Sequence, residues 1–307
     1  MILTVCPNPC LDCTIELDNL NVGRLNRIDN KIVNYAGKAL NVAVGIARLG
    51  SPVTASGFMF EDEGKIFEQK LLKEGVVPDF VWNNGNVRVN YKIIDKNFML
   101  TEINDRGEII SIDKQEELIS KVANLSKKAE IVVMSGSLPS GVDKTFYREI
   151  FSVIPKNVGK VCDTEKENMV EALKCGLTLI KPNLRELEDM GGKKLSTRKD
   201  ILQAANTMID KGTASVLVSL GIDGAIYTNG TQGLYCKSMN VAVNSTVGAG
   251  DAMLAAACVA IKEGVSCKEL LRMSVSAGTA AVTTSGSNLF YKDKYDEVYK
   301  NLVVENI

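Results

Sequence analysis

Residues 243–253 read Val-Asn-Ser-Thr-Val-Gly-Ala-Gly-Asp-Ala-Met, and an apolar run follows them. Two glycines flanking Ala249 predict a tight turn that opens a buried helix. The first amide N–H groups of a helix are free and the helix dipole is positive there, so this turn is suited to an anion. A carboxylate beside a phosphate makes sense when it takes a proton from an attacking hydroxyl. We therefore expect Asp251 to be a catalytic base, with the amides of Gly248, Ala249 and Gly250 holding the developing charge.

Other interpretations of this stretch stay open on its local pattern alone. Aspartate is also a common stabilising residue in the first turn of a helix, and Gly-Ala-Gly can be a simple turn. A dinucleotide-binding fingerprint fits less well, because Met253 stands where the third small residue of G-x-G-x-x-G belongs. The sequence contains no Walker A motif, since Gly37-Lys38 and Gly64-Lys65 both lack the following Ser or Thr.

The composition narrows the class of protein. The chain has 307 residues, 45% apolar and 24% charged, with a net charge of −1. It can bury a large core, so we expect one domain over residues 1–307. Without a long basic run, electrostatic binding of nucleic acid is not expected. No apolar run has the length of a membrane span and no signal-like segment opens the sequence, so we expect a cytoplasmic protein without membrane contact.

Histidine is absent from the sequence, which removes histidine-based nucleophile pairs, histidine-bound zinc and an imidazole base. Proton transfer must then use a carboxylate, lysine, tyrosine or cysteine. Of the eight cysteines, only Cys10 and Cys13 have the C-x-x-C spacing of a metal or redox site, and no second pair follows. We expect reduced thiols, several of them buried as small apolar groups.

The pattern of apolar residues predicts two kinds of sheet. Short apolar strands alternate with helical stretches along most of the chain, which predicts a mostly parallel sheet covered by helices on both faces. Residues 15–33 alternate polar and apolar side chains between turn residues, as an antiparallel strand pair does. Residues 86–94 have the same period of two, which places Arg88, Asn90 and Lys92 on one face. These three can grip a phosphate, although a solvated strand face is the commoner explanation.

Polar residues also stand where strands and helices meet turns. Asp12 would face a cleft at a strand end, or could be a simple Asx-type turn residue. Lys38 and Asn41 lie one turn apart at the start of a predicted helix, a place suited to a phosphate or to sugar hydroxyls, although surface positions are the commoner interpretation. Asn183 and Glu186 share one face at the start of another helix, where they can equally form a capping box.

Taken in chain order, these motifs resemble the ribokinase-like carbohydrate kinases of phosphofructokinase B type. The resemblance rests on N-P-x-x-D at 8–12, the turn and helix at 36–43, N-x-x-E at 183–186 and the turn at 248–251, and it extends over nearly the full length. It implies a ribokinase-like α/β fold with a small β-sheet lid over the acceptor, contributed by residues 11–35 and 87–104. It also implies a homodimer formed through the lids.

The run R-x-N-x-K at 88–92 and T-E-I-N at 101–104 resembles the branch of that family formed by 1-phosphofructokinases and tagatose-6-phosphate kinases. The resemblance implies ATP-dependent phosphorylation of fructose 1-phosphate to fructose 1,6-bisphosphate. Tagatose 6-phosphate and fructose 6-phosphate are the alternative acceptors. A different class, a sugar-phosphate-binding regulator without catalysis, is supported by Ala36 and Ala39, which replace two glycines of the family's G-G-K-G-x-N-x-A motif.

The same resemblance assigns binding residues. The acceptor would be bound by Asp12, Gly37, Lys38, Asn41, Arg88, Asn90, Lys92, Thr101, Asn104 and Ser137. ATP would be bound by Lys181, Asn183, Ser219, Leu220, Gly221, Gly224 and Ala277, with Ala280 beside Ala277 at the adenine. Mg²⁺ would be placed indirectly through Asn183 and Glu186, and a monovalent cation is a further candidate. We expect Asp251 to be ionised at neutral pH, because the helix dipole and the amides favour its charged form.

Overall fold

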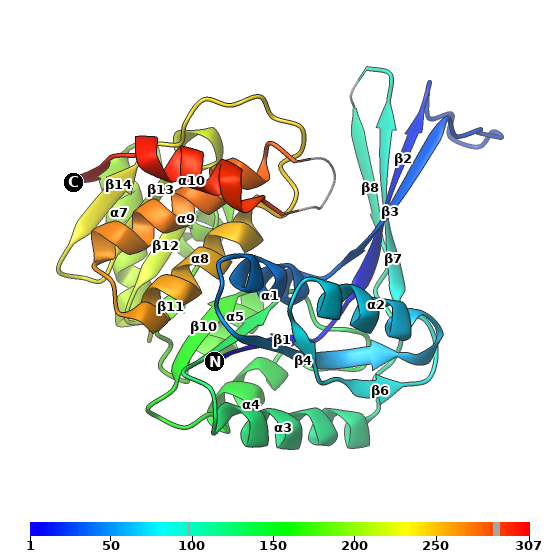
Figure 1. Cartoon of the computed structure of the whole chain (residues 1–307), viewed down its shortest axis with the longest axis horizontal. Helices are drawn as coiled ribbons and strands as arrows, with labels where there is room; N and C mark the ends of the chain where they lie inside the picture. The colour runs from blue at the N-terminus through cyan, green and yellow to red at the C-terminus, as the bar shows by residue number, and fades with distance from the viewer. Residues whose placement is uncertain (98, 285–288) are drawn as a thin grey trace.

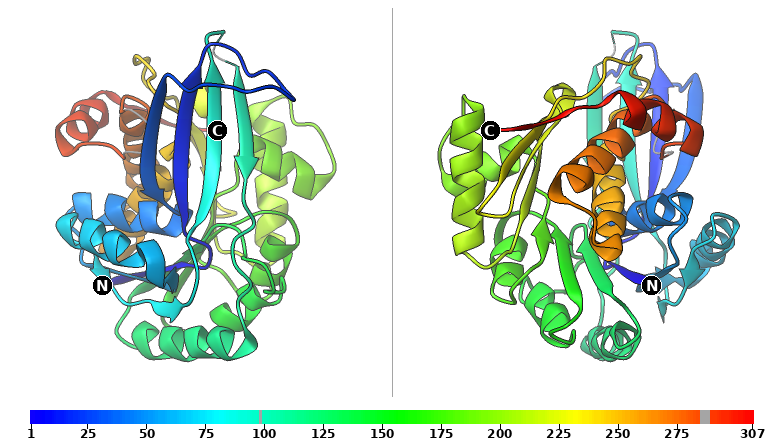
Figure 2. Two further views of the ribbon diagram at one scale, coloured as in Figure 1. Left: turned by 90° about the vertical axis from the view of Figure 1, so that its right-hand side faces the viewer. Right: turned by 60° about the vertical axis from the view of Figure 1, so that its left-hand side comes forward.

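The computed structural model describes residues 1–97, 99–284 and 289–307. A large central sheet lies between two sets of helices, and a second, smaller sheet projects away from it (Figure 1). Figure 2 shows that the small sheet rises over one edge of the central sheet. The architecture therefore has the α/β layers and the lid that the sequence predicts.

Within the described part of the chain, the central sheet has eleven strands. In spatial order they are β15 (Val304–Asn306), β14 (Gly233–Cys236), β13 (Ala225–Thr228), β12 (Val216–Ser219), β11 (Leu179–Ile180), β10 (Gly159–Asp163), β9 (Ile131–Ser135), β1 (Ile2–Cys6), β4 (Val53–Phe60) and β5 (Val77–Pro78), with β6 (Val81–Asn83) also paired to β4. All pairs from β5 to β12 are parallel, whereas β12 to β15 pair antiparallel. The mostly parallel sheet is confirmed, and the antiparallel edge is an addition that the sequence pattern did not predict.

The parallel strands are continuous apolar runs because helices cover both of their faces. Every residue of β1, β4 and β9 is buried. One face carries a connected layer of α1 (Lys38–Arg48), α8 (Ala249–Glu263), α9 (Cys267–Ala281) and α10 (Lys292–Asn301), and α2 (Glu61–Lys73) packs near β4 and β5. The other layer contains α3 (Ile112–Ser126), α4 (Phe146–Ser152), α5 (Lys166–Leu173), α6 (Leu184–Gly191) and α7 (Arg198–Asp210). Within the described residues, no helix has the length and apolar character that crossing a membrane requires.

The lid is a four-stranded sheet in the order β3 (Asn30–Ala36), β2 (Cys10–Leu17), β7 (Arg88–Asp95) and β8 (Leu100–Asn104). Its strands come from the two segments that the sequence assigns to it. The strand pair expected within 15–33 begins earlier, and an irregular connection at 18–29 joins β2 to β3. β2 and β7 are parallel, since the chain enters the lid twice from the same side of the central sheet.

The parallel order of the central sheet fixes where polar side chains collect. Parallel strands end at one common edge, and a cleft forms beyond their carboxyl ends. β9, β10 and β12 end there in Ser135, Asp163 and Ser219, and the chain continues from β1 into the lid. The edge of the central sheet and the inner face of the lid therefore enclose the candidate site.

Candidate active site

A cavity of about 1090 Å³ lies between the lid and the carboxyl edge of the parallel strands. The structure brings most of the predicted residues to its wall. Those that line it are Asp12, Gly37, Lys38, Asn41, Arg88, Asn90, Lys92, Asn104, Ser137, Lys181, Asn183, Glu186, Ser219, Gly221, Gly224, Gly248, Ala249, Gly250 and Asp251. Residues far apart in the sequence therefore converge on one concave surface, as binding sites of α/β proteins do.

Four predicted residues do not line the cavity. Side chains alternate along a strand, and Glu102 faces the cavity, so Thr101 lies on the opposite face of β8. Leu220 stands between two cavity residues without lining the cavity itself. Ala277 is fully buried within α9, and the next residue, Gly278, lines the wall instead. Successive residues of a helix point in different directions, so a motif comparison alone cannot say which of two neighbouring residues faces the cavity. Ala280, assigned to the same adenine wall, is also fully buried and absent from the lining.

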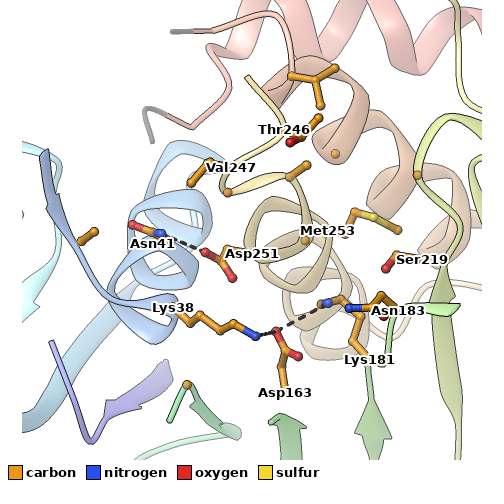
Figure 3. Close-up of a pocket in the computed structure, with 18 of the residues that line it drawn as sticks. Lys38, Asn41, Asp163, Lys181, Asn183, Ser219, Thr246, Val247, Asp251 and Met253 are labelled. Atoms are coloured by element: carbon orange, nitrogen blue, oxygen red, sulfur yellow. Dashed lines mark hydrogen bonds and ion pairs between the residues drawn. The ribbon is translucent and has the colours of Figure 1, made fainter. Parts of the chain in front are cut away.

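The glycine turn opens α8 as expected. Gly248 is the residue before the helix and has φ 82°, a left-handed conformation that favours glycine. Asp251 lies in the first turn of α8 and is only 7% exposed. Asn41 of α1 donates a hydrogen bond from Nδ2 to Asp251 Oδ2 at 2.8 Å. Figure 3 shows the two side chains pointing toward each other across the cavity.

Burial, rather than the helix dipole, dominates the acidity of Asp251. Loss of hydration raises the pKa of Asp251 to about 6, partly offset by the ammonium group of Lys38, and the neighbouring Asp163 raises it further. The Asn41 hydrogen bond and Lys181 act in the opposite direction. The expected direction of the shift is therefore wrong, although a carboxyl group with this pKa is still mostly ionised above pH 7.

Asp163, which the sequence analysis missed, lies at the centre of the site. Its side chain is 2% exposed, and Oδ2 lies 3.8 Å from Lys38 Nζ and 3.5 Å from Lys181 Nζ. Burial alone would raise the pKa of Asp163, but the two ammonium groups outweigh it and hold the pKa below its usual value. Asp163 in turn raises the pKa of Lys38. The same strand-end argument that selected Asp12 applies to Asp163 and could have found it.

Lys181 lies directly beside the glycine turn. A Cβ atom built on Gly250 would stand 3.2 Å from Lys181 Nζ, so a side chain at this position would crowd the ammonium group. At the start of α8, Ala249 N donates a long hydrogen bond to Thr246 O at 3.5 Å, whereas none of the described hydrogen bonds uses the amides of Gly250 and Asp251. These amides border the cavity together with the buried ammonium group of Lys181 and the carboxylate of Asp251. This arrangement can hold a transferring phosphoryl group while a hydroxyl is deprotonated.

The lid wall of the cavity carries a second polar network. Asp12 Oδ2 forms an ion pair with Lys92 Nζ at 2.7 Å, and Asn90 Nδ2 donates to Asp12 Oδ1 at 3.3 Å. Arg88 donates to the Asn90 side chain at 3.2 Å and to the backbone oxygens of Asp105 at 3.0 Å and Asn8 at 3.3 Å. The face predicted from the period of two is therefore the face that lines the cavity.

Asn183 and Glu186 form the capping box of α6, the alternative that the sequence left open. Asn183 N donates to Glu186 Oε2 at 2.8 Å, and Glu186 N donates to Asn183 Oδ1 at 2.9 Å. Both residues also line the cavity. Among the described residues, no group of three or more acidic, cysteine or histidine side chains could enclose a metal ion. Glu186 is then the one carboxylate of this pair that can interact with a metal ion. A single carboxylate suits a Mg²⁺ that binds together with phosphate groups and keeps most of its water ligands.

The wall near α9 is largely apolar. The sequence analysis missed these residues, which include Met253, Val275, Gly278, Thr279 and Val282 together with residues 238–241 and Val243. They lie beyond the glycine turn from the lid, and a flat apolar ring can be buried against such a surface. The cavity therefore has a charged centre, a polar lid side and an apolar side.

Comparison with known proteins places the chain in one family. The model of the pfkB family carbohydrate kinases matches residues 8–294. The 1-phosphofructokinase of Escherichia coli strain K12 is 31% identical over 294 residues, which is 95% of this chain and 94% of that protein. The tagatose-6-phosphate kinase of Staphylococcus epidermidis is 28% identical over 308 residues, with 99% of each chain covered.

Solved structures give the same picture. Phosphofructokinase-2 from Escherichia coli, in complex with potassium, has a TM-score of 0.89 and 28% identity, over 97% of this chain and 98% of that chain. The same relative has been solved in complex with fructose 6-phosphate, and in a tetrameric inhibited form. The fold is thus shared over almost the whole chain.

The raised pKa of Asp251 predicts a pH-dependent effect on stability. The folded protein binds this proton more tightly than the unfolded chain, so the contribution is present below about pH 4 and is lost as the pH rises through 6. Burying the charge at pH 8 then costs about 2 to 3 kcal/mol. Asp251→Asn should therefore be more stable than the wild type at pH 8, by urea unfolding.

The difference should shrink by about 1 kcal/mol or more when unfolding is repeated at pH 5. Asp210→Asn, which removes an exposed carboxylate at the end of α7, is the control and should match the wild type at both pH values. Equal stability of Asp251→Asn and wild type at pH 8 would contradict the assigned burial of the charge.

Proposed function

The chain belongs to the pfkB family of carbohydrate kinases, and from this we propose that it transfers a phosphoryl group from ATP to a ketohexose phosphate, chiefly fructose 1-phosphate, to give fructose 1,6-bisphosphate. All of residues 1–307 would form one kinase domain. The observation that carries the proposal is that Asp251, the glycine turn and the lid residue Arg88 all line one cavity. The names of the relatives support a phosphorylated ketohexose acceptor.

The proposed reaction is a direct in-line transfer. An acceptor hydroxyl beside Asp251 loses its proton to Oδ1 of the Asp251 carboxylate, since Oδ2 accepts the hydrogen bond from the Asn41 amide and none of the described hydrogen bonds uses Oδ1. The acceptor oxygen bonds to the γ-phosphorus as the bond to the β-phosphate oxygen breaks, and ADP leaves. The amides of Gly248–Gly250 and the ammonium group of Lys181 bind the oxygens on which charge develops.

The nucleotide would extend from the turn toward the apolar wall. Its phosphates would pass Lys181 and Asn183, and its base would lie against Gly278 and its apolar neighbours. Magnesium would be held through Glu186 and Asn183 by way of water, and it supplies charge neutralisation between the phosphates when bound. A monovalent cation stays a prediction, for which the potassium complex of phosphofructokinase-2 is the support.

The pairing of charges in the cavity points to where the phosphate of the acceptor binds. Lys92 is paired with Asp12, and Lys38 and Lys181 share Asp163. Arg88 has hydrogen bonds only to an amide and to backbone oxygens among the described contacts. A cation without a carboxylate partner attracts a dianion most strongly, so we propose Arg88 as the main contact of the acceptor phosphate.

The regulator without catalysis is less well supported. Ala39, one of its two supporting residues, is fully buried and does not line the cavity, so its methyl group cannot block an acceptor. Gly37 is kept, and a Cβ atom there would stand 2.9 Å from Cys6 Sγ. Tagatose 6-phosphate and fructose 6-phosphate remain the alternative acceptors, because Arg88 can bind a phosphate at either end of the sugar.

ADP release with a panel of acceptors tests the function. We expect the highest kcat/KM for fructose 1-phosphate, lower values for tagatose 6-phosphate and fructose 6-phosphate, and very low values for fructose, ribose and adenosine. Arg88→Met should lower kcat/KM for phosphorylated acceptors by about a hundredfold, while that for fructose changes little. Binding of sugar phosphates without ADP release would favour the regulator, and equal losses for fructose and its phosphates would exclude Arg88 as the phosphate contact.

Replacement of the base gives a second test. Asp251→Asn keeps the hydrogen bond from Asn41 but cannot accept a proton, so turnover should fall by at least about a hundredfold. The acceptor KM should stay within a few fold, since the binding contacts remain. Near-normal turnover in this variant would remove Asp251 from the mechanism.

We also propose a homodimer formed through the lid. Val33, Cys13, Tyr91 and Ile103 lie in register across its four strands, on the face opposite the cavity. Val33, Tyr91 and Ile103 are 39%, 40% and 55% exposed, an unusual apolar row for a free surface. A second copy of this chain can cover the row by packing its own lid against it.

Sedimentation velocity at micromolar concentration should show a dimer, and Ile103→Glu should convert it to a monomer. Ile66→Glu is the control, because this residue is similarly exposed on α2, away from the row. A wild-type monomer, or a dimer that both variants keep, would exclude the lid as the interface.

A further inference from the structure

We propose that Asp163 is a positioning residue that holds the ammonium groups of Lys38 and Lys181 on two sides of the point of phosphoryl transfer. The inference rests on the proposed function, because it assigns a role within that reaction. Asp163 would touch neither the sugar nor the nucleotide and would act only through the two lysines. Its position at the end of β10 places it beneath the space between α1 and α8 (Figure 3).

The contacts of Asp163 converge on one oxygen. Lys38 Nζ, Lys181 Nζ and the hydroxyl of Ser135 all approach Oδ2, at 3.8, 3.5 and 3.5 Å. Lys38 comes from the helix whose Asn41 bonds the base, and Lys181 stands against Gly250 in the anion turn. One carboxylate thus joins a cation on the acceptor side to a cation on the nucleotide side.

Burial makes this carboxylate decisive for the two lysines. The Asp163 side chain is 2% exposed and the Lys181 side chain 5%, so neither can exchange its partner for water. The Lys38 side chain is 45% exposed and could turn to solvent if nothing held it. Two ammonium groups this close repel each other strongly where little water screens them. A shared negative charge is therefore what keeps Lys38 directed inward.

Charged and titratable groups from every neighbouring element act on this cluster. They are Lys38 of α1, Cys162 and Asp163 of β10, Tyr147 of α4, Glu165 before α5, Lys181 after β11, Glu186 of α6 and Asp251 of α8. Asp163 raises the pKa of both Lys38 and Asp251. Removing its charge should therefore lower the pKa of both groups, a change that a purely structural role would not produce.

The kinetic test compares Asp163→Asn with the wild type between pH 5.5 and 9, using ADP release with the best acceptor. We expect kcat to fall at least about thirtyfold with the acceptor KM within about threefold, since the phosphoryl group loses two aligned cations. The acid limb of the kcat/KM profile should move to lower pH by about half a unit or more, because the base is then easier to ionise. Unchanged kcat, or an acid limb that stays in place, would overturn the proposal.

Glu171→Gln is the matched control. Glu171 also bonds two cations, Arg148 at 3.4 Å and Lys174 at 2.5 Å, and its side chain is 11% exposed. It does not line the cavity. Its replacement should leave both kcat and the pH profile as in the wild type. This result would show that the effect of Asp163→Asn is not a general effect of removing a carboxylate that binds two cations.

A readout without turnover keeps the proposal independent of the acceptor. Acylation of Lys38 by a water-soluble amine reagent, followed by peptide mass spectrometry, should be at least about fivefold faster in Asp163→Asn than in the wild type. The exposed Lys73 on α2 should react equally in both proteins, which controls for the amount and activity of the reagent. If Asp163→Asn does not fold, Lys181→Met serves instead, and Lys38 should then react more slowly because Asp163 is left to it alone.

These results separate the two claims. A wild type that releases no ADP with any acceptor would reject the proposed function. Equal acylation of Lys38 in wild type and Asp163→Asn, or in wild type and Lys181→Met, would reject the role of Asp163, whether or not the protein turns over.

Discussion

The close packing of α1 against α8 is the constraint on which the site depends. A Cβ atom on Gly45 would lie 2.7 Å from the Cβ atom of Ala255, so the two helices approach as nearly as small residues allow. This contact brings the first turns of both helices together, and with them Asn41 and Asp251. Larger side chains at the contact would separate Asn41 from Asp251.

The site is electrically balanced in pairs rather than lined by one sign of charge. Asp12 forms an ion pair with Lys92 on the lid, and Asp163 forms ion pairs with both Lys38 and Lys181 at the edge of the central sheet. Balanced pairs keep buried charges tolerable before substrates bind. Among the described contacts, Arg88 has no carboxylate partner, and under the proposed function it would bind a phosphate group together with amides of the glycine turn.

Local signals in the sequence predicted the layers of the central sheet, whereas the family resemblance supplied the lid and many of the residues that line the cavity. The glycine turn, strand-end residues and the period of two at Arg88 carry their meaning without tertiary detail. Asp163 was missed although it stands at a strand end, because the two lysines that reveal its role are distant from it in sequence. The predictions for Thr101 and Ala277 were wrong because each residue lies on a face of its strand or helix that does not line the cavity. The pKa of Asp251 depends on burial, which no motif contains.

The junction between the lid and α1 has a mechanical consequence. β3 ends at Ala36, and Gly37 alone separates it from the helix that carries Lys38 and Asn41. A bridge of one residue, with φ 145°, leaves no slack to absorb a displacement of the strand. A displacement of β3 would therefore be transmitted directly to the first turn of α1, which couples the position of the lid to the positions of Lys38 and Asn41.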